Sequence, residues 1–107
     1  MHIWFNDFIT FCRSLSGQTL HTLSRKLPFE FEMHEEHEVK FCFTPLSTSW
    51  SRAVRQRYTE EYINQFNTNG GSLRPGDYDV GVNASYMVTL FKLYQGYLLK
   101  KWRNSTP

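Results

Sequence analysis

The stretch FEFEMHEEHEVKFCF, residues 29–43, alternates apolar and polar side chains over most of its length. In an extended chain this alternation places the phenylalanines on one face and the glutamates on the other. The period of two predicts half-buried β-strands over residues 29–34 and 38–44. We expect the two strands to form a hairpin with a tight turn at Glu35-Glu36-His37.

The turn sets the register of this hairpin, because every apolar side chain must stay on one face. The expected inner-face partners are Phe31 with Phe41, Phe29 with Phe43, and Met33 with Val39. On the outer face Glu32 is expected opposite Lys40, an ion pair worth about 0.2–1 kcal/mol, whereas each buried ring contributes about 1.5–3 kcal/mol. The phenylalanines therefore stabilise the hairpin more than its charges do.

Other segments show helical periods or weaker strand patterns. Apolar residues recur every three or four positions over residues 3–15, which predicts an amphipathic helix ended by Ser16-Gly17. TLHTL at residues 19–23 predicts a third, less regular strand. A second helix is expected through Tyr58–Phe66, ending at Gly70-Gly71.

The start of this second helix is expected between two positions, Ser51 and an N-cap at Thr59. A start at Ser51 places Arg55 on the apolar stripe near the core, where a glutamate pairs with it, and Arg57 on the opposite side. The three arginines of residues 52–57 then do not form one patch. A start with Thr59 as the N-cap leaves these arginines on an irregular arm before the helix.

The last helix is expected over residues 84–102, after Asn83 as its N-cap. One apolar stripe consists of Ala84, Met87, Val88, Phe91, Tyr94 and Leu98, and a second consists of Tyr86, Leu90, Leu93 and Tyr97. A helix with two such stripes is either central in its own domain or meets a second subunit. These elements predict a single α+β domain over residues 1–107. Their expected order is α-β-β-β-α-α, an antiparallel three-stranded meander packed by helices.

Composition narrows the class of protein. The chain lacks an apolar run long enough to span a membrane, and its start MHIWFNDFITF lacks the features of a signal peptide. We therefore expect a cytoplasmic protein without a membrane partner. Cys12 and Cys42 have no metal-ligand spacing and are expected to act as small hydrophobic residues. Aromatic residues make up 17% of the chain, more than a small core needs, which indicates that some of them face a partner.

No motif has the spacing of a catalytic or metal site. His34-Glu35-Glu36-His37 lacks the two residues after the glutamate that zinc proteases need, and it lies in a strand and turn. Asp77, Asp79, Glu60 and Glu61 are explained by turn formation and by the electrostatics of a helix start. We therefore expect no enzyme, no cofactor and no bound metal.

Five segments, within about residues 17–95, follow an order that carries a resemblance. They are PFEFE, FTPLSTS, RAVRQRYTEEYINQFN, GSLRPGDY and NASY. This order resembles that of small bacterial proteins encoded in mobile gene pools such as integron gene cassettes. The resemblance implies a bacterial cytoplasmic accessory protein and transfers no activity.

Charge is close to balance at +2 but alternates in sign along the chain. Residues 28–44 hold five glutamates and one lysine, whereas residues 45–59 hold three arginines and no acid. Residues 80–107 hold three lysines and one arginine without an acid. Such segregation can guide a charged partner to the surface.

Two functions from different classes fit these patterns. The first is a protein-interaction module, including a homodimer, that uses either an open strand edge or the second apolar stripe of the last helix, namely Tyr86, Leu90, Leu93 and Tyr97. Charge complementarity between the acidic hairpin and the arginine stretch would fix its register. The alternative is nucleic-acid binding, for which the expected contacts are Trp50, Arg52, Arg55, Arg57, Lys100, Lys101 and Arg103. Beside these two, binding of a small ligand in a pocket among the aromatic residues is a third hypothesis.

Overall fold

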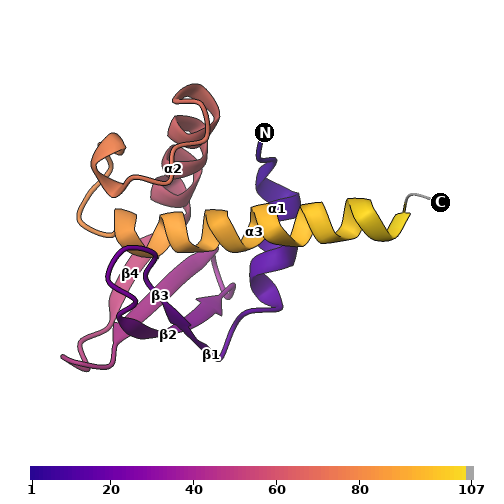
Figure 1. Cartoon of the computed structure of the whole chain (residues 1–107). Coiled ribbons are helices and arrows are strands. Elements are labelled where there is room, and N and C mark those ends of the chain that lie inside the picture. The colour runs from indigo at the N-terminus through magenta and orange to yellow at the C-terminus, as the bar shows by residue number, and fades with distance from the viewer. Residues whose placement is uncertain (106–107) are drawn as a thin grey trace.

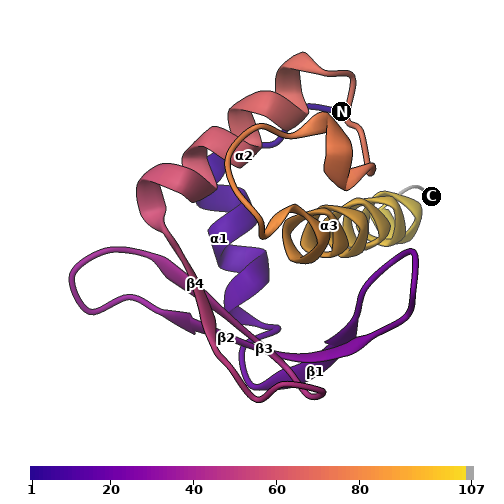
Figure 2. The ribbon, with the colours of Figure 1, turned by 90° about the vertical axis from the view of Figure 1, so that its left-hand side faces the viewer.

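Four antiparallel strands and three α-helices account for most of residues 1–105, the part of the chain that the computed structural model describes. The sheet has the order β1-β2-β3-β4, with bounds Gln18–His21, Pro28–His34, Lys40–Pro45 and Arg52–Arg55. The helices are α1 (Phe5–Arg13), α2 (Gln56–Thr68) and α3 (Ala84–Ser105), with a 3-10 helix η1 (Pro75–Asp77) before α3. All three α-helices lie over one face of the sheet (Figures 1 and 2). The predicted single α+β domain is confirmed for these residues, and residues 106 and 107 lie outside the described part.

The fourth strand corrects the predicted three-stranded meander. Val54, at the centre of β4, lies opposite Phe41 on β3 and is buried. With a start at Ser51, the second helix would have included Val54, which precedes Tyr58 by one helical turn. Helix α2 instead begins at Gln56, between the two expected starts, and Thr59 is buried within it rather than acting as its N-cap. Residues 52–55 form a strand because they pair with β3, and the local periodicity of the sequence gives no sign of that long-range pairing.

The hairpin of β2 and β3 is present, but its predicted register is wrong by two residues. Phe31 lies opposite Phe43 instead of Phe41. The remaining shifted partners are Phe29 with Pro45, Glu30 with Thr44, Glu32 with Cys42, Met33 with Phe41, and His34 with Lys40. A shift of two leaves every side chain on its original face, so the alternation of apolar residues is satisfied by both registers.

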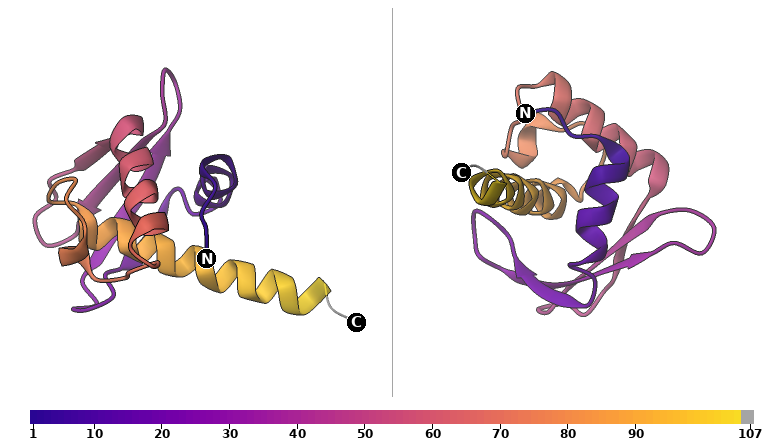
Figure 3. Two further views of the ribbon diagram at one scale, coloured as in Figure 1. Left: turned by 90° about the horizontal axis from the view of Figure 1, so that it is seen from above. Right: turned by 90° about the vertical axis from the view of Figure 1, so that its right-hand side faces the viewer.

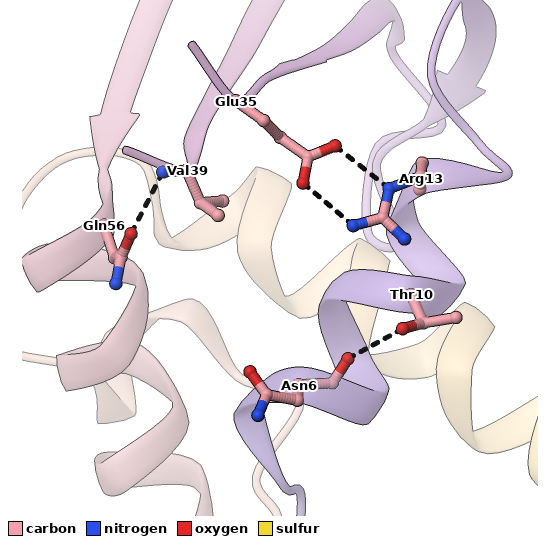
Figure 4. A network of polar contacts seen from close by, with 6 residues as sticks. All are labelled: Asn6, Thr10, Arg13, Glu35, Val39 and Gln56. Atoms are coloured by element: carbon pink, nitrogen blue, oxygen red, sulfur yellow. Dashed lines mark hydrogen bonds and ion pairs between the residues drawn. The ribbon is translucent and has the colours of Figure 1, made fainter. Parts of the chain in front are cut away.

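Contacts from two helices explain why the hairpin loop is longer than predicted. The carboxylate of Glu35 accepts hydrogen bonds of 3.0 and 2.8 Å from the guanidinium of Arg13 on α1. The backbone N–H of Val39 donates to Oε1 of Gln56 on α2, at 3.0 Å (Figure 4). Both ends of the loop are therefore held by side chains that lie far away in the sequence.

Phenylalanine rings build the core, where the sheet meets the helices. Phe8 of α1 lies 5.4 Å, between ring centroids, from both Phe91 and Tyr94 of α3. The fully buried phenylalanines are Phe8, Phe29, Phe31, Phe41, Phe43, Phe66 and Phe91. The aromatic content of the chain is thus used largely inside the domain. The three tryptophans, Trp4, Trp50 and Trp102, are exposed.

The ends of α1 and α3 differ in how their caps form. Helix α1 ends at Arg13, earlier than the predicted end at Ser16-Gly17, and its C-cap Ser14 is in the right-handed helical region. Gly17 has a φ of 90° just before β1, where its N–H donates to the carbonyl of Phe31. At the start of α3 the backbone carbonyl of Asn83 accepts the N–H groups of Tyr86 and Met87. Its side-chain Oδ1, which was expected to cap the helix, is buried without a hydrogen-bond partner. Asn83 thus marks the helix start through its backbone.

Candidate functional site

The first half of α3 lies in the centre of the domain. Met87, Leu90 and Phe91 are fully buried, and the ring of Phe91 lies 4.8 Å from that of Phe66 on α2. Helix α1 crosses α3 near its middle, where Phe11 lies 4.9 Å from Tyr97 between ring centroids. This half of the helix is therefore packed by its own domain, which is one of the two alternatives expected from its apolar stripes.

The second half of α3 extends beyond the rest of the molecule (Figures 1 and 3). A helix of 22 residues is about 33 Å long. The molecule is elongated, with extents of 46 × 33 × 27 Å. Leu98 is the last α3 side chain packed against the core. Beyond it, Leu99 is 57% exposed and Trp102 is 64% exposed. The projecting end therefore combines regular helix with apolar surface in water.

The predicted interface residues divide into two groups. Leu90 is buried and Tyr86 is half-buried, with its ring 4.9 and 5.1 Å from those of Phe29 and Phe43. Leu90 therefore has no surface to offer a partner, which corrects its predicted place at an interface, and Tyr86 packs partly against the core. Leu93 and Tyr97 do reach the surface, with exposures of 37% and 44%.

Sequence reasoning missed two members of the exposed surface. Leu99 lies off both predicted stripes, and Trp102 is flanked by basic residues, so neither was selected. The missing signal was the length of the helix relative to its supporting layer. We define the α3 tip as the exposed side chains Leu93, Tyr97, Leu99 and Trp102.

Basic side chains surround the α3 tip. Lys92, Lys100 and Lys101 are exposed, and the ammonium of Lys101 lies 6.0 Å from the centre of the Tyr97 ring. This cation–π contact holds one positive charge directly over the apolar surface. On the outer face of β2 and at its loop, Glu30, Glu32 and Glu36 are exposed. The molecule therefore carries a basic projection, and its sheet has an acidic area at β2 and the following loop, beside Lys40 and Arg55 on the same outer face.

The arginine stretch does not form one patch, because side chains alternate across β4. Arg52 lies on the inner side with its guanidinium 5.9 Å above the ring of Tyr86. Arg57, in the first turn of α2, lies 4.6 Å from the ring centre of its neighbour Tyr58. Trp50 is 78% exposed in the loop before β4. Lys100 and Lys101 lie near the C-terminal end of α3, which projects away from β4 and α2 (Figure 1).

Arg55 lies on the outer face of the sheet, which corrects its predicted place near the core. Its side chain is 66% exposed. The expected pairing with a glutamate is confirmed: the guanidinium donates hydrogen bonds of 2.8 and 3.4 Å to the carboxylate of Glu38. The hydrogen bond from Arg55 holds the pKa of Glu38 below its usual value. The acidic hairpin and the arginine stretch thus pair within one chain, and this pairing is not free to set a register between two chains.

Groups typical of catalytic or metal chemistry are dispersed over the described residues. Within residues 1–105, no three side chains of His, Cys, Asp or Glu lie close enough together to hold a metal ion. Cys12 is buried and Cys42 is half-buried, and burial raises the pKa of both thiols. No helix in the same part of the chain has the length and apolar character required to cross a membrane.

No protein-family model, curated protein or solved structure matches this chain. Its function is therefore inferred from the geometry of its own side chains.

Proposed function

We propose that this protein is a non-enzymatic interaction module that forms a homodimer through the α3 tip. The observation that carries this proposal is the exposed apolar surface on a helix that continues beyond its own core. The order of its sequence segments suggests that it serves as a bacterial cytoplasmic accessory protein. Its chemistry is recognition of a second copy of the same chain.

The physical reason for a partner lies in the stability of a helix end that projects beyond the core. Short helical segments are marginal in water, and most helical stability in proteins comes from packing of an apolar face. Residues 99–105 continue the helix after the last core contact, at Leu98. Leu99 and Trp102 are three residues apart and therefore share one face of the helix, so a partner that packs on them would support this end. Such a partner also removes from water an apolar surface of the kind that marks interaction sites.

Charge favours a second copy as this partner and also suggests where it binds. Direct pairing of two α3 tips would bring the lysines of both copies together. Glu30 and Glu32 on the outer face of β2, with Glu36 in the following loop, complement Lys100 and Lys101. In a two-fold dimer each tip can pack beside the acidic hairpin of the other copy, so both complementary contacts form at once.

A matched pair of substitutions tests this interface. Leu99→Asp places a charge beside Trp102 on one face of the α3 tip, whereas Leu46→Asp changes a leucine of similar exposure in the loop after β3. We expect Leu99→Asp to convert the dimer to a monomer in sedimentation experiments and Leu46→Asp to leave the dimer intact. Circular dichroism verifies that both variants retain their helices. A dimer that persists in Leu99→Asp contradicts the proposal.

Charge reversal locates the surface on which the tip binds. The double variant Lys100→Glu/Lys101→Glu should weaken the dimer by about tenfold or more, because the two introduced glutamates would then face the carboxylates of Glu30 and Glu36. Adding Glu30→Lys and Glu36→Lys should restore it. Failure of the combined variant to recover affinity would show that the acidic hairpin is not the receiving surface.

Nucleic-acid binding is the second candidate, and it is favoured by the position of Lys101 over the exposed Tyr97 ring. Basic groups beside an aromatic ring suit contact with phosphates and stacking on bases. The separation of the arginine stretch from the α3 tip limits such a site to the helix end. A monomer that binds DNA or RNA, with affinity that falls steeply as salt rises, would place this candidate first.

A further inference from the structure

A cavity of about 450 Å³ lies at the opposite end of α3 from the tip. Its walls come from the turn between β1 and β2, the start of β4, the segment around η1 and the first turns of α3. Figure 2 shows the turn between β1 and β2 beside α3. The volume falls within the range of sites that bind small organic molecules.

The cavity has a positive electrostatic character. Arg25 and Arg52 both line it, and none of its twelve lining residues is acidic. Ser85 also lines the cavity and lies in the first turn of α3, so the N-terminal end of this helix borders the cavity. The helix dipole is positive at that end. Three sources of positive potential thus surround one space. Such an arrangement favours an anionic group over a neutral or cationic one.

The remaining wall is mainly apolar. Leu23, Leu73, Val82 and Val88 contribute aliphatic surface, and Tyr86 contributes an aromatic ring. The ring of Tyr86 also lies beneath Arg52, which places the charged group next to apolar surface. A purely inorganic anion would leave this surface uncovered. The lining therefore fits a molecule with one acidic group and an apolar body.

Two short segments that form the walls are held in place before any ligand binds. Thr22 organises the turn between β1 and β2, because its Oγ1 accepts the N–H of Leu27 at 3.0 Å and its carbonyl accepts that of Lys26 at 3.0 Å. On the other side, the hydroxyl of Tyr78 donates to the carbonyl of Ser72 at 2.6 Å. A preorganised cavity reduces the entropy lost on binding.

The geometry points to a binding site for a small amphipathic carboxylate in this cavity. Arg25 and Arg52 bind the carboxylate, and Leu23, Leu73 and Val82 cover the apolar body. The site is separate from the α3 tip, so a ligand can occupy it in either the monomer or the dimer.

Octanoate is a suitable probe, with octan-1-ol as its neutral counterpart and inorganic phosphate as an anion without an apolar body. Calorimetric titration of the full-length protein should show saturable binding of one octanoate per chain. Both comparison molecules should bind at least about tenfold more weakly, since each lacks one of the two recognised features. Equal binding of octan-1-ol or of phosphate would overturn the assignment, as would the absence of octanoate binding.

Substitutions then locate the site. Arg52→Ala and Arg25→Ala should each weaken octanoate binding by about 10- to 100-fold. Arg57→Ala, which removes an arginine outside the cavity, should leave it unchanged. Val82→Glu adds a negative charge to an exposed wall residue and should abolish binding, whereas Val82→Gln should retain it. The monomeric variant Leu99→Asp should bind octanoate like the unmodified chain. Octanoate binding that survives both Arg52→Ala and Val82→Glu would overturn the site.

Discussion

Phe31 and Phe43 lie opposite each other on β2 and β3, with their ring centroids 5.6 Å apart and their planes inclined by 27°. This pair fixes the register of the central hairpin, and it places Glu32 opposite Cys42 on the outer face.

Oxidation of a single introduced cysteine tests that register. Directly opposed residues on antiparallel strands have the Cα separation that a disulfide requires. Glu32→Cys should therefore form a disulfide with the native Cys42 under mild oxidation, which mass spectrometry without reduction detects. Glu30→Cys, whose partner is Thr44, is the matched control and should remain a thiol. Disulfide formation in the control alone would contradict the register.

Removal of a core ring should cost far more stability than removal of a ring at the core margin. Phe8 is fully buried among the rings of Phe41, Phe91 and Tyr94, so Phe8→Ala should reduce the free energy of unfolding by about 3–5 kcal/mol. Phe11→Ala removes a half-buried ring from the same helix and should cost less. Urea unfolding measures both values. Equal losses would show that α1 is not packed through Phe8.

Two exposed ion pairs should make stability sensitive to acid. Hydrogen bonds from Arg13 and Arg55 lower the pKa of Glu35 and Glu38, respectively, below the usual 4.5. Their contribution is complete above that value, and it is lost as the pH falls through the lowered pKa values. The melting temperature of Glu35→Gln/Glu38→Gln should therefore fall less between pH 5 and pH 3 than that of the unmodified protein.

The control for this measurement is Glu36→Gln, which removes a carboxylate from the same loop without touching either ion pair. Its melting temperature should depend on pH as that of the unmodified protein does. An unchanged acid sensitivity in the double variant would show that neither pair contributes to stability. Because both pairs are exposed, added salt should reduce the difference between the variants.

The two thiols should differ in reactivity. Burial raises the pKa of the Cys12 thiol well above its usual value. Burial also raises the pKa of Cys42, but this side chain is only half-buried. Since the thiolate is the reactive form, iodoacetamide should modify Cys42 first in the folded protein, and Cys12 should react only after unfolding. Intact-mass measurements over time follow both reactions. Faster modification of Cys12 would contradict its placement in the core.

Local sequence patterns predicted the layers of this fold but not its pairing details. Alternation in residues 29–43 correctly placed the phenylalanines inside, yet it satisfied two registers equally. The longer loop depends on Glu35 reaching Arg13 and on Val39 reaching Gln56, both in helices distant along the chain. Similarly, β4 has a single buried apolar residue, Val54, so its strand character is evident only beside Phe41.

The candidate sites show the same limit. Periodicity identified α3 as apolar on two sides, but it could not show where the supporting layer ends. That boundary places Leu90 in the core and Leu99 in water. The cavity collects Arg25, Arg52, Leu73 and Ser85 from four separate segments, and no local motif connects them. Only the folded chain brings these residues together.

The most direct test of the central claim is the mass of the unmodified protein in solution, measured by sedimentation equilibrium over a wide range of concentration. The α3 tip as a self-recognition surface predicts a species of twice the 12.7 kDa of one chain, which dissociates on dilution and at high salt. A mass of one chain at every concentration would contradict the account.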